Sequence, residues 1–126
     1  MKTITKTLNE LNALNEMIGS QNIMQMSFSK KANLSIARNV RKIQDELKEY
    51  IDKRTDLIHK YTNGSDSITR DNPKWNDFIE ELKELGSVDA TLNINTITFE
   101  DLPDNATPMV CALLDFMIED EQDEEA

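Results

Sequence analysis

The sequence predicts an α+β fold that is mainly helical, with one long central helix packed with three shorter helices and a small antiparallel sheet. Residues 29–61 repeat apolar side chains at intervals of three and four, as one face of a helix requires. Residues 22–28 and 88–100 instead alternate apolar and polar side chains, which is typical of strands. A chain of 126 residues, 38% hydrophobic and 30% charged, suits one domain with a modest core.

The N-terminal part predicts a short helix followed by a strand. The apolar residues from about 3 to 18 recur on one side of a helix: Ile4, Leu8, Leu11, Leu14 and Ile18. Gly19 then provides a stop. In residues 22–28 the period changes, because Met24, Met26 and Phe28 alternate with polar residues. We therefore place the first strand of the sheet there.

Residues 29–61 are the element around which the rest of the chain is organised. Their apolar stripe comprises Ile36, Ala37, Val40, Ile43, Leu47, Tyr50, Ile51, Leu57, Ile58 and Tyr61. Ser29 is expected to cap this helix, because its hydroxyl can accept a hydrogen bond from an amide one turn further on. At about 1.5 Å per residue the helix would be roughly 48 Å long, so part of its stripe needs a neighbour in the chain or a partner.

The third helix is predicted to begin at Asn72-Pro73, an N-cap residue followed by proline at the first helical position. It is expected to end at Gly86. Its buried face is predicted to comprise Trp75, Phe78, Ile79, Leu82 and Leu85.

The alternation in residues 88–99 changes parity between Ile94 and Ile97. We favour a hairpin with a two-residue turn at Asn95-Thr96, which would place these two isoleucines opposite each other. A bulge in one long strand would also absorb the change.

Thr107-Pro108 repeats the cap-and-proline pattern and predicts a last helix over residues 109–118. This segment is apolar nearly all round, so its helix is either central in the core or half covered by another molecule. We therefore assign residues 1–118 to a single helical α+β domain and residues 119–126 to an acidic C-terminal tail.

The net charge of −10 is unevenly distributed. Residues 1–70 carry 12 Lys/Arg against 8 Asp/Glu, a net of +4, whereas residues 71–126 carry 2 against 16, a net of −14. No apolar run is long enough to span a membrane, and the first residues lack the apolar core of a signal peptide. Cys111 is the only cysteine, which excludes an internal disulfide and favours a reducing cytosol.

One further pattern lies in the order of the elements. A short apolar-faced helix and a Met/Phe strand precede a long helix that is first basic and then mixed in charge. After the long helix come an aromatic helix ending at residues 78–85, the alternating residues 88–99 and a Thr107-Pro108 helix. This order resembles a family of short uncharacterised proteins encoded by tailed bacteriophages and prophages. The resemblance implies an accessory protein encoded near virion-assembly or lysis genes, located in the host cytoplasm or the virion. It implies no catalytic residue.

The sequence offers no spaced group of residues for catalysis. His59 is the only histidine, so no His-His metal pair can form within the chain. It could act as a base for Cys111, but a free cysteine is more often a small buried apolar residue. Asp101 and Asp104 could bind a cation, although two carboxylates in a loop are commonly solvated turn residues. We expect no catalytic residue, no metal site and no cofactor.

The candidate partner-binding residues are basic, apolar and acidic in turn: Lys30, Lys31, Arg38, Arg41 and Lys42; Met109 and Phe116; Glu119, Asp120 and Glu121. The basic group lacks interleaved aromatic residues for stacking, so direct binding of nucleic acid is not expected. We expect a non-enzymatic accessory protein of bacteriophage type that acts through a protein partner, host or phage, or as a homo-oligomer. Two alternatives stay open. One is an acidic inhibitor of a host defence nuclease, of the anti-CRISPR or nucleic-acid-mimic type, that uses residues 100–125; the other is a virion or tail assembly component.

Overall fold

The computed structural model describes residues 1–119 and confirms the predicted fold class. The main elements follow in the order β1 (Lys2–Thr7), α1 (Leu8–Ser20), α2 (Lys30–Thr62), α3 (Trp75–Gly86), β2 (Asp89–Ile94) and α4 (Pro108–Leu114). Three short 3-10 helices lie between or after them: Ile23–Gln25, Phe99–Asp101 and Asp115–Met117.

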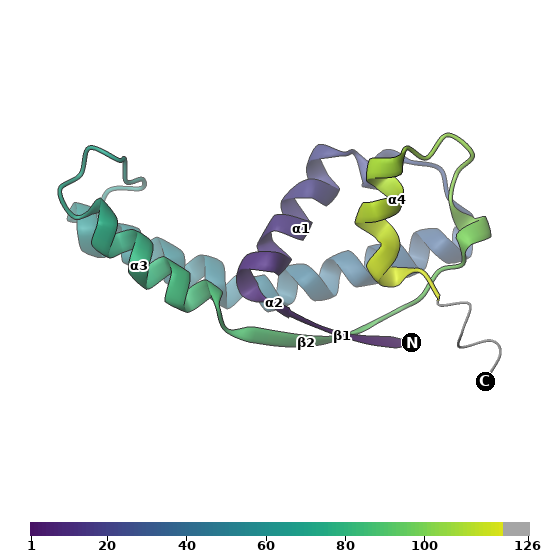
Figure 1. Ribbon diagram of the computed structural model, residues 1–126, viewed down its shortest axis with the longest axis horizontal. Helices are drawn as coiled ribbons and strands as arrows, with labels where there is room; N and C mark the ends of the chain where they lie inside the picture. The colour runs from purple at the N-terminus through teal and green to yellow at the C-terminus, as the bar shows by residue number, and fades with distance from the viewer. Residues whose placement is uncertain (120–126) are drawn as a thin grey trace.

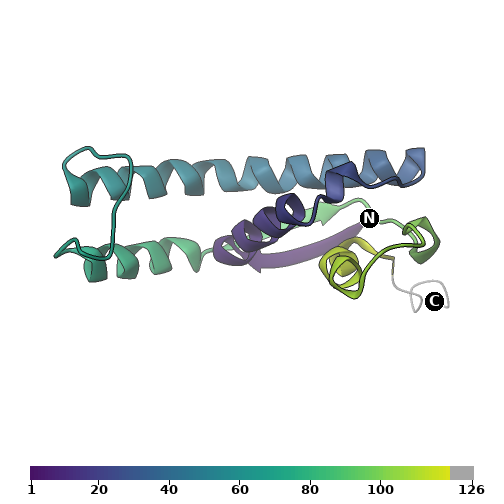
Figure 2. The same cartoon turned by 90° about the horizontal axis from the view of Figure 1, so that it is seen from above.

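Two regions share the long helix α2, as Figures 1 and 2 show. Along its second half runs α3 alone, and we call residues 51–86 the arm. Along its first half lie α1 and the two-stranded sheet, with α4 next to α1 on the side away from α2, and we call residues 1–50 and 87–119 the head. Nearly all of the buried apolar core belongs to the head.

The long helix forms as predicted. Ser29 caps it by accepting a hydrogen bond from the backbone N–H of Ala32 at 3.2 Å. At the other end Asn63 adopts a left-handed conformation, and its N–H donates to the carbonyl of His59. The buried side of α2 comprises Ala32, Ile36, Asn39, Val40, Ile43, Leu47 and Tyr50, so the predicted stripe is fully covered over the head alone.

The predicted sheet partner, residues 22–28, was wrong. The first strand is Lys2–Thr7, whereas residues 23–25 form a 3-10 helix with Ile23 buried. The predicted helix over residues 3–18 therefore begins only at Leu8, where Thr7 and Glu10 form a capping box. The β-branched residues of β1 favour a strand, and β2 supplies the partner that a strand requires.

The predicted hairpin in residues 88–99 was also wrong, and no bulged strand replaces it. Strand β2 ends at Ile94, and the buried amide of Asn39 then accepts from the N–H of Asn95 and donates to its carbonyl, both at 2.8 Å. This side chain takes the place of a strand partner. The chain continues to Ile97, whose backbone bonds Met117 and Glu119 instead.

The fourth helix keeps its predicted cap, whereas the third begins two residues later than predicted, with Lys74 at its N-cap position, and neither has its full predicted length. The side-chain oxygen of Asn72 accepts from the N–H of Lys74 at 2.8 Å, and regular helix begins at Trp75. Thr107 caps α4, with Pro108 in its first turn. The predicted helix over 109–118 stops at Leu114 and tightens into a 3-10 turn. The predicted tail, apart from its first residue, lies outside the described residues.

Candidate functional site

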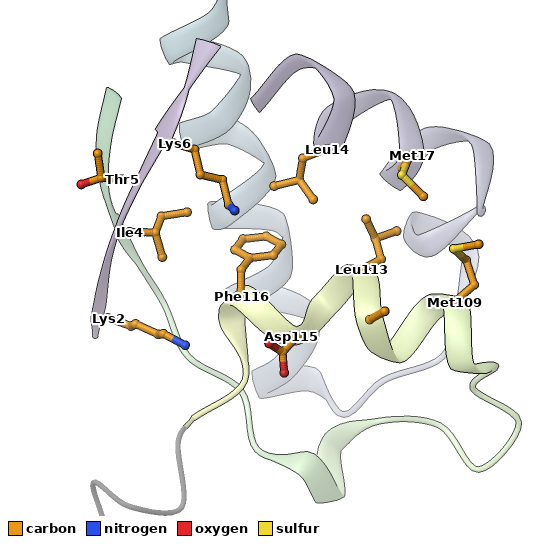
Figure 3. Close-up of a pocket in the computed structure, with 11 residues that line it drawn as sticks. Lys2, Ile4, Thr5, Lys6, Leu14, Met17, Met109, Leu113, Asp115 and Phe116 are labelled. Carbon is orange, nitrogen blue, oxygen red and sulfur yellow. The ribbon is translucent and has the colours of Figure 1, made fainter. Parts of the chain in front are cut away.

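The head carries an open groove of about 660 Å³ between β1, α1 and α4 (Figure 3). It is lined by Lys2, Ile4, Thr5 and Lys6 of β1, Leu14 and Met17 of α1, and Met109, Ala112, Leu113, Asp115 and Phe116 at or after α4. Most of these side chains are apolar; Lys2 and Asp115 lie at one side, whereas the Lys6 side chain extends into the groove toward Leu14 and Phe116. A concave apolar site with a few polar groups is the usual form of a binding site.

The period of two in β1 decides which side chains reach the groove. Lys2, Ile4 and Lys6 share one face of the strand, and all three are half-buried. Figure 3 shows Ile4, Lys6 and Phe116 directed toward one another across the groove. The isoleucine thus forms part of an apolar floor, with one lysine on either side of it along the strand.

The hydrogen-bond ladder decides which backbone groups of β1 are already paired. The N–H of Leu8 donates to the carbonyl of Val88 at 3.0 Å. In an antiparallel pair every second residue is hydrogen-bonded to the residue opposite it, so Lys6, Ile4 and Lys2 also belong to bonded pairs. The even-numbered residues of β1 therefore bond β2.

The odd-numbered residues of β1 direct their backbone groups away from β2. The hydroxyl of Thr3 donates to the Asn93 side-chain oxygen, and the Thr5 and Thr91 hydroxyls are 3.0 Å apart. Such close side chains are typical of non-hydrogen-bonded pairs. Within residues 1–119, Thr3 and Thr5 make no backbone hydrogen bond outside the ladder, so β1 has an open edge. The groove touches Thr5 but no residue of β2, so it follows this edge.

The opposite wall is flexible and apolar. Met17 is 37% exposed and Met109 is 51% exposed, and Figure 3 shows them together at one end of the groove. Leu14 and Phe116 are half-buried nearer to β1. Methionine side chains adapt to different shapes, which suits a surface that receives another chain.

The predicted basic residues lie elsewhere, on the solvent side of α2. Lys30, Lys31, Arg38 and Arg41 are exposed, whereas Lys42 donates to the carbonyl of Asn93 at 2.7 Å and so holds β2 against the helix. The structure therefore separates this group from Met109 and Phe116, which it does bring together. Leu34, 51% exposed, lies on the same turns as the basic residues.

Of the predicted acidic residues, Glu119 is exposed, and its N–H bonds the carbonyl of Ile97 at 2.8 Å. Asp120 and Glu121 lie outside the described residues. Asp101 is engaged in the fold: the backbone N–H of Thr98 lowers the pKa of its carboxyl, with smaller contributions from the Thr98 hydroxyl, Ser29 and Lys31. Its carboxylate serves as a structural link between the loop and the start of α2.

The arm has a polar contact of its own. One oxygen of Glu81 accepts from the hydroxyl of Tyr61 at 2.6 Å and from the ammonium of Lys60 at 2.9 Å. These two bonds lower the pKa of Glu81, and the same carboxylate raises the pKa of Tyr61. The rings of Tyr61 and Trp75 pack against Phe78, so this contact joins the ends of α2 and α3.

The residues considered for chemistry are not assembled into a site. His59 is in the last turn of α2, in the arm, and Cys111 is in α4, in the head. Within residues 1–119 there is no group of three or more His, Cys, Asp or Glu side chains placed to hold a metal ion. No helix in the same part of the chain is long and apolar enough to cross a membrane.

Comparison with known proteins found no matching family model, no matching curated protein and no matching solved structure. The groove is therefore a candidate binding site on the basis of its geometry. The sequence did not reveal its β1 side, because the apolar spacing predicts one helix over residues 3–18. The alternation of threonine with lysine and isoleucine in residues 2–7 was the signal that could have revealed it.

Proposed function

We propose that this chain is a non-enzymatic accessory protein that acts by binding another protein in the groove between β1, α1 and α4. The observation that carries the proposal is the combination of an open strand edge with exposed apolar side chains along one groove. An open strand edge and an exposed apolar surface both favour the binding of another polypeptide chain.

The apolar wall would supply the affinity. Met17 and Met109 leave much of their surface in water in the isolated chain. Burying such side chains contributes about 25 cal/mol per Å² of apolar surface. The half-buried ring of Phe116 adds an aromatic anchor between these methionines and β1.

We further propose that the setting is bacteriophage infection, with the protein in the host cytoplasm. This part of the proposal rests on the resemblance to short phage and prophage proteins: the long helix and the Thr107-Pro108 helix of that pattern are present, whereas residues 23–25 form a 3-10 helix in place of its Met/Phe strand. In the alternative role, as a virion or tail component, the same apolar groove would bind a different partner, a virion protein.

The proposal is tested by capturing partners from phage-infected cells with the tagged full chain and two variants. The first variant is Met17→Ser with Met109→Ser. The matched control is Met24→Ser, because Met24 is 53% exposed but lies on the 3-10 helix, outside this groove. We expect the double variant to recover at least about tenfold less of its partner, and the control to recover as much as the wild type.

Recovery that is unchanged in the double variant would contradict the groove as the binding site. Recovery that falls only when salt is raised, equally in all three proteins, would favour the acidic-inhibitor alternative, since exposed charge contacts are screened.

A further inference from the structure

We propose that the partner binds as an extended segment that adds a third strand to the open edge of β1, and that this segment carries an apolar residue opposite Ile4 and an acidic residue beside Lys6. The inference rests on the proposed function and specifies its binding mode. It names a partner by chemistry: a short acidic strand of another protein.

The backbone of β1 provides the template. The outward N–H and C=O groups of Thr3 and Thr5 lie on the open edge of β1 at the spacing of a strand, and Thr5 also lines the groove. An added strand would bond these groups in the way that β2 already bonds those of Lys2, Ile4 and Lys6. Strand addition of this kind draws affinity from main-chain bonds and specificity from alternate side chains.

The side chains of β1 then set the sequence of the guest strand. On the groove face, a guest residue opposite Ile4 would meet the apolar floor formed with Leu14 and Phe116. A guest residue two positions away would lie beside Lys6, where opposite charge is favourable. Asp115 stands near the Lys2 end of the groove, so the charge preference is strongest at Lys6.

A second copy of this chain fits the edge less well. Two β1 strands paired antiparallel about Ile4 would place Lys2 of one opposite Lys6 of the other, on the same face. Like charges directly opposite each other destabilise a strand pair, and edge lysines are a known protection against such self-pairing.

The acidic tail of this chain has the right charge but the wrong pattern. Residues 120–126 contain five Asp/Glu, one glutamine and, at the end, one alanine. They therefore offer no large apolar side chain for the floor at Ile4. An acidic strand from another protein satisfies both requirements.

The test measures binding of the full chain to a labelled synthetic peptide, acetyl-Thr-Glu-Thr-Val-Thr-Glu-Thr-amide, by fluorescence anisotropy. Thr5→Pro removes an outward N–H of β1 without removing a ladder bond. The matched control is Thr91→Pro, which loses the same hydroxyl contact but alters β2. Thr5→Ala is a second control, because it loses the hydroxyl and keeps the amide. We expect Thr5→Pro to weaken binding at least about tenfold and both controls to stay within about twofold.

A charge-reversed peptide, with lysine in place of both glutamates, tests the recognition by Lys6. We expect the wild type to prefer the acidic peptide, and Lys6→Glu to reverse that preference. Equal binding of both peptides by the wild type would overturn the predicted sequence pattern. A dimer in sedimentation that Thr5→Pro dissociates would show that a second copy occupies the edge, and would overturn the assignment to another protein.

The strand mode and the proposed function fail in different ways. If the cellular partner is lost with Met17→Ser and Met109→Ser but retained with Thr5→Pro, the groove binds a protein and the strand mode is wrong. If neither variant changes recovery of the partner, the groove is not the site and both proposals are wrong.

Discussion

The head and the arm share one helix but are held together differently. Within the described residues, the head contributes every fully covered core side chain of α2, whereas Phe78 is the one large side chain that the arm buries to that extent. The arm is two helices thick, so the apolar residues of α3 and of the end of α2 have cover on one side only. A polar contact at Glu81 and an aromatic cluster close its far end. Most of the stabilising core therefore lies in the head, the region that also forms the groove.

The largest expected effect comes from comparing two leucines of α2. Leu47 is fully buried in the head, and Leu57 is half-buried in the arm. Leu47→Ala should lower the free energy of unfolding by about 3 kcal/mol, because it leaves a cavity in a closed core. Leu57→Ala should cost about 1 kcal/mol, since less apolar surface is lost. Urea denaturation of both variants measures the difference, and equal losses would remove the distinction between the two regions.

A second prediction concerns the buried amide that ends β2. Asn39 is completely buried, and its side chain makes both hydrogen bonds to the backbone of Asn95. Asn39→Ala should destabilise the protein by about 2 kcal/mol, because it leaves a buried N–H and C=O without their partner. Thermal unfolding provides the measurement. A variant as stable as the wild type would show that the loop after Ile94 is held by other contacts.

A smaller effect is expected at the end of the arm. Since hydrogen bonds from Tyr61 and Lys60 lower the pKa of Glu81 in the folded chain, their contribution is present above the ordinary carboxyl pKa of 4.5. It is lost as the pH falls through the lowered folded-state pKa. Acidification should therefore lower the protection factors of the α3 amides, taken relative to their intrinsic exchange rates at each pH, and Glu81→Gln should reduce that pH dependence while leaving β1 and β2 unchanged. Loss of protection in the sheet as well would mean that arm and head unfold together.

The sequence predicted the long helix and the caps of α2 and α4 well because these signals are local. Ser29 and Thr107 bond amides three residues away, and the stripe of α2 repeats within each turn. Helix α3 was also predicted from local signals and ends at Gly86 as expected, although it begins at Trp75 with Lys74 rather than Asn72 at its N-cap position.

The sheet could not be predicted in the same way, because its pairing is not local. Ile4 lies four residues before Leu8, so it extends the helical pattern of α1 as readily as it alternates within β1. Whether Ile4 lies in a helix or a strand depends on Leu92, which pairs with it although it lies far along the sequence. The groove was missed for this reason, and only its α4 side was found, through Met109 and Phe116. Of the predicted basic group on α2, Lys30, Lys31, Arg38 and Arg41 are exposed and do not line the groove, and Lys42 bonds the backbone of Asn93.

Residue-resolved amide exchange of the full chain, with and without the acidic peptide, would show directly whether a strand adds to β1. Strand addition predicts that the amides of Thr3 and Thr5 become protected, while Ile4, already bonded to β2, changes little. Protection confined to α2 around Arg38 and Arg41, with Thr3 and Thr5 unchanged, would contradict the account and move the binding surface to the basic face of the long helix.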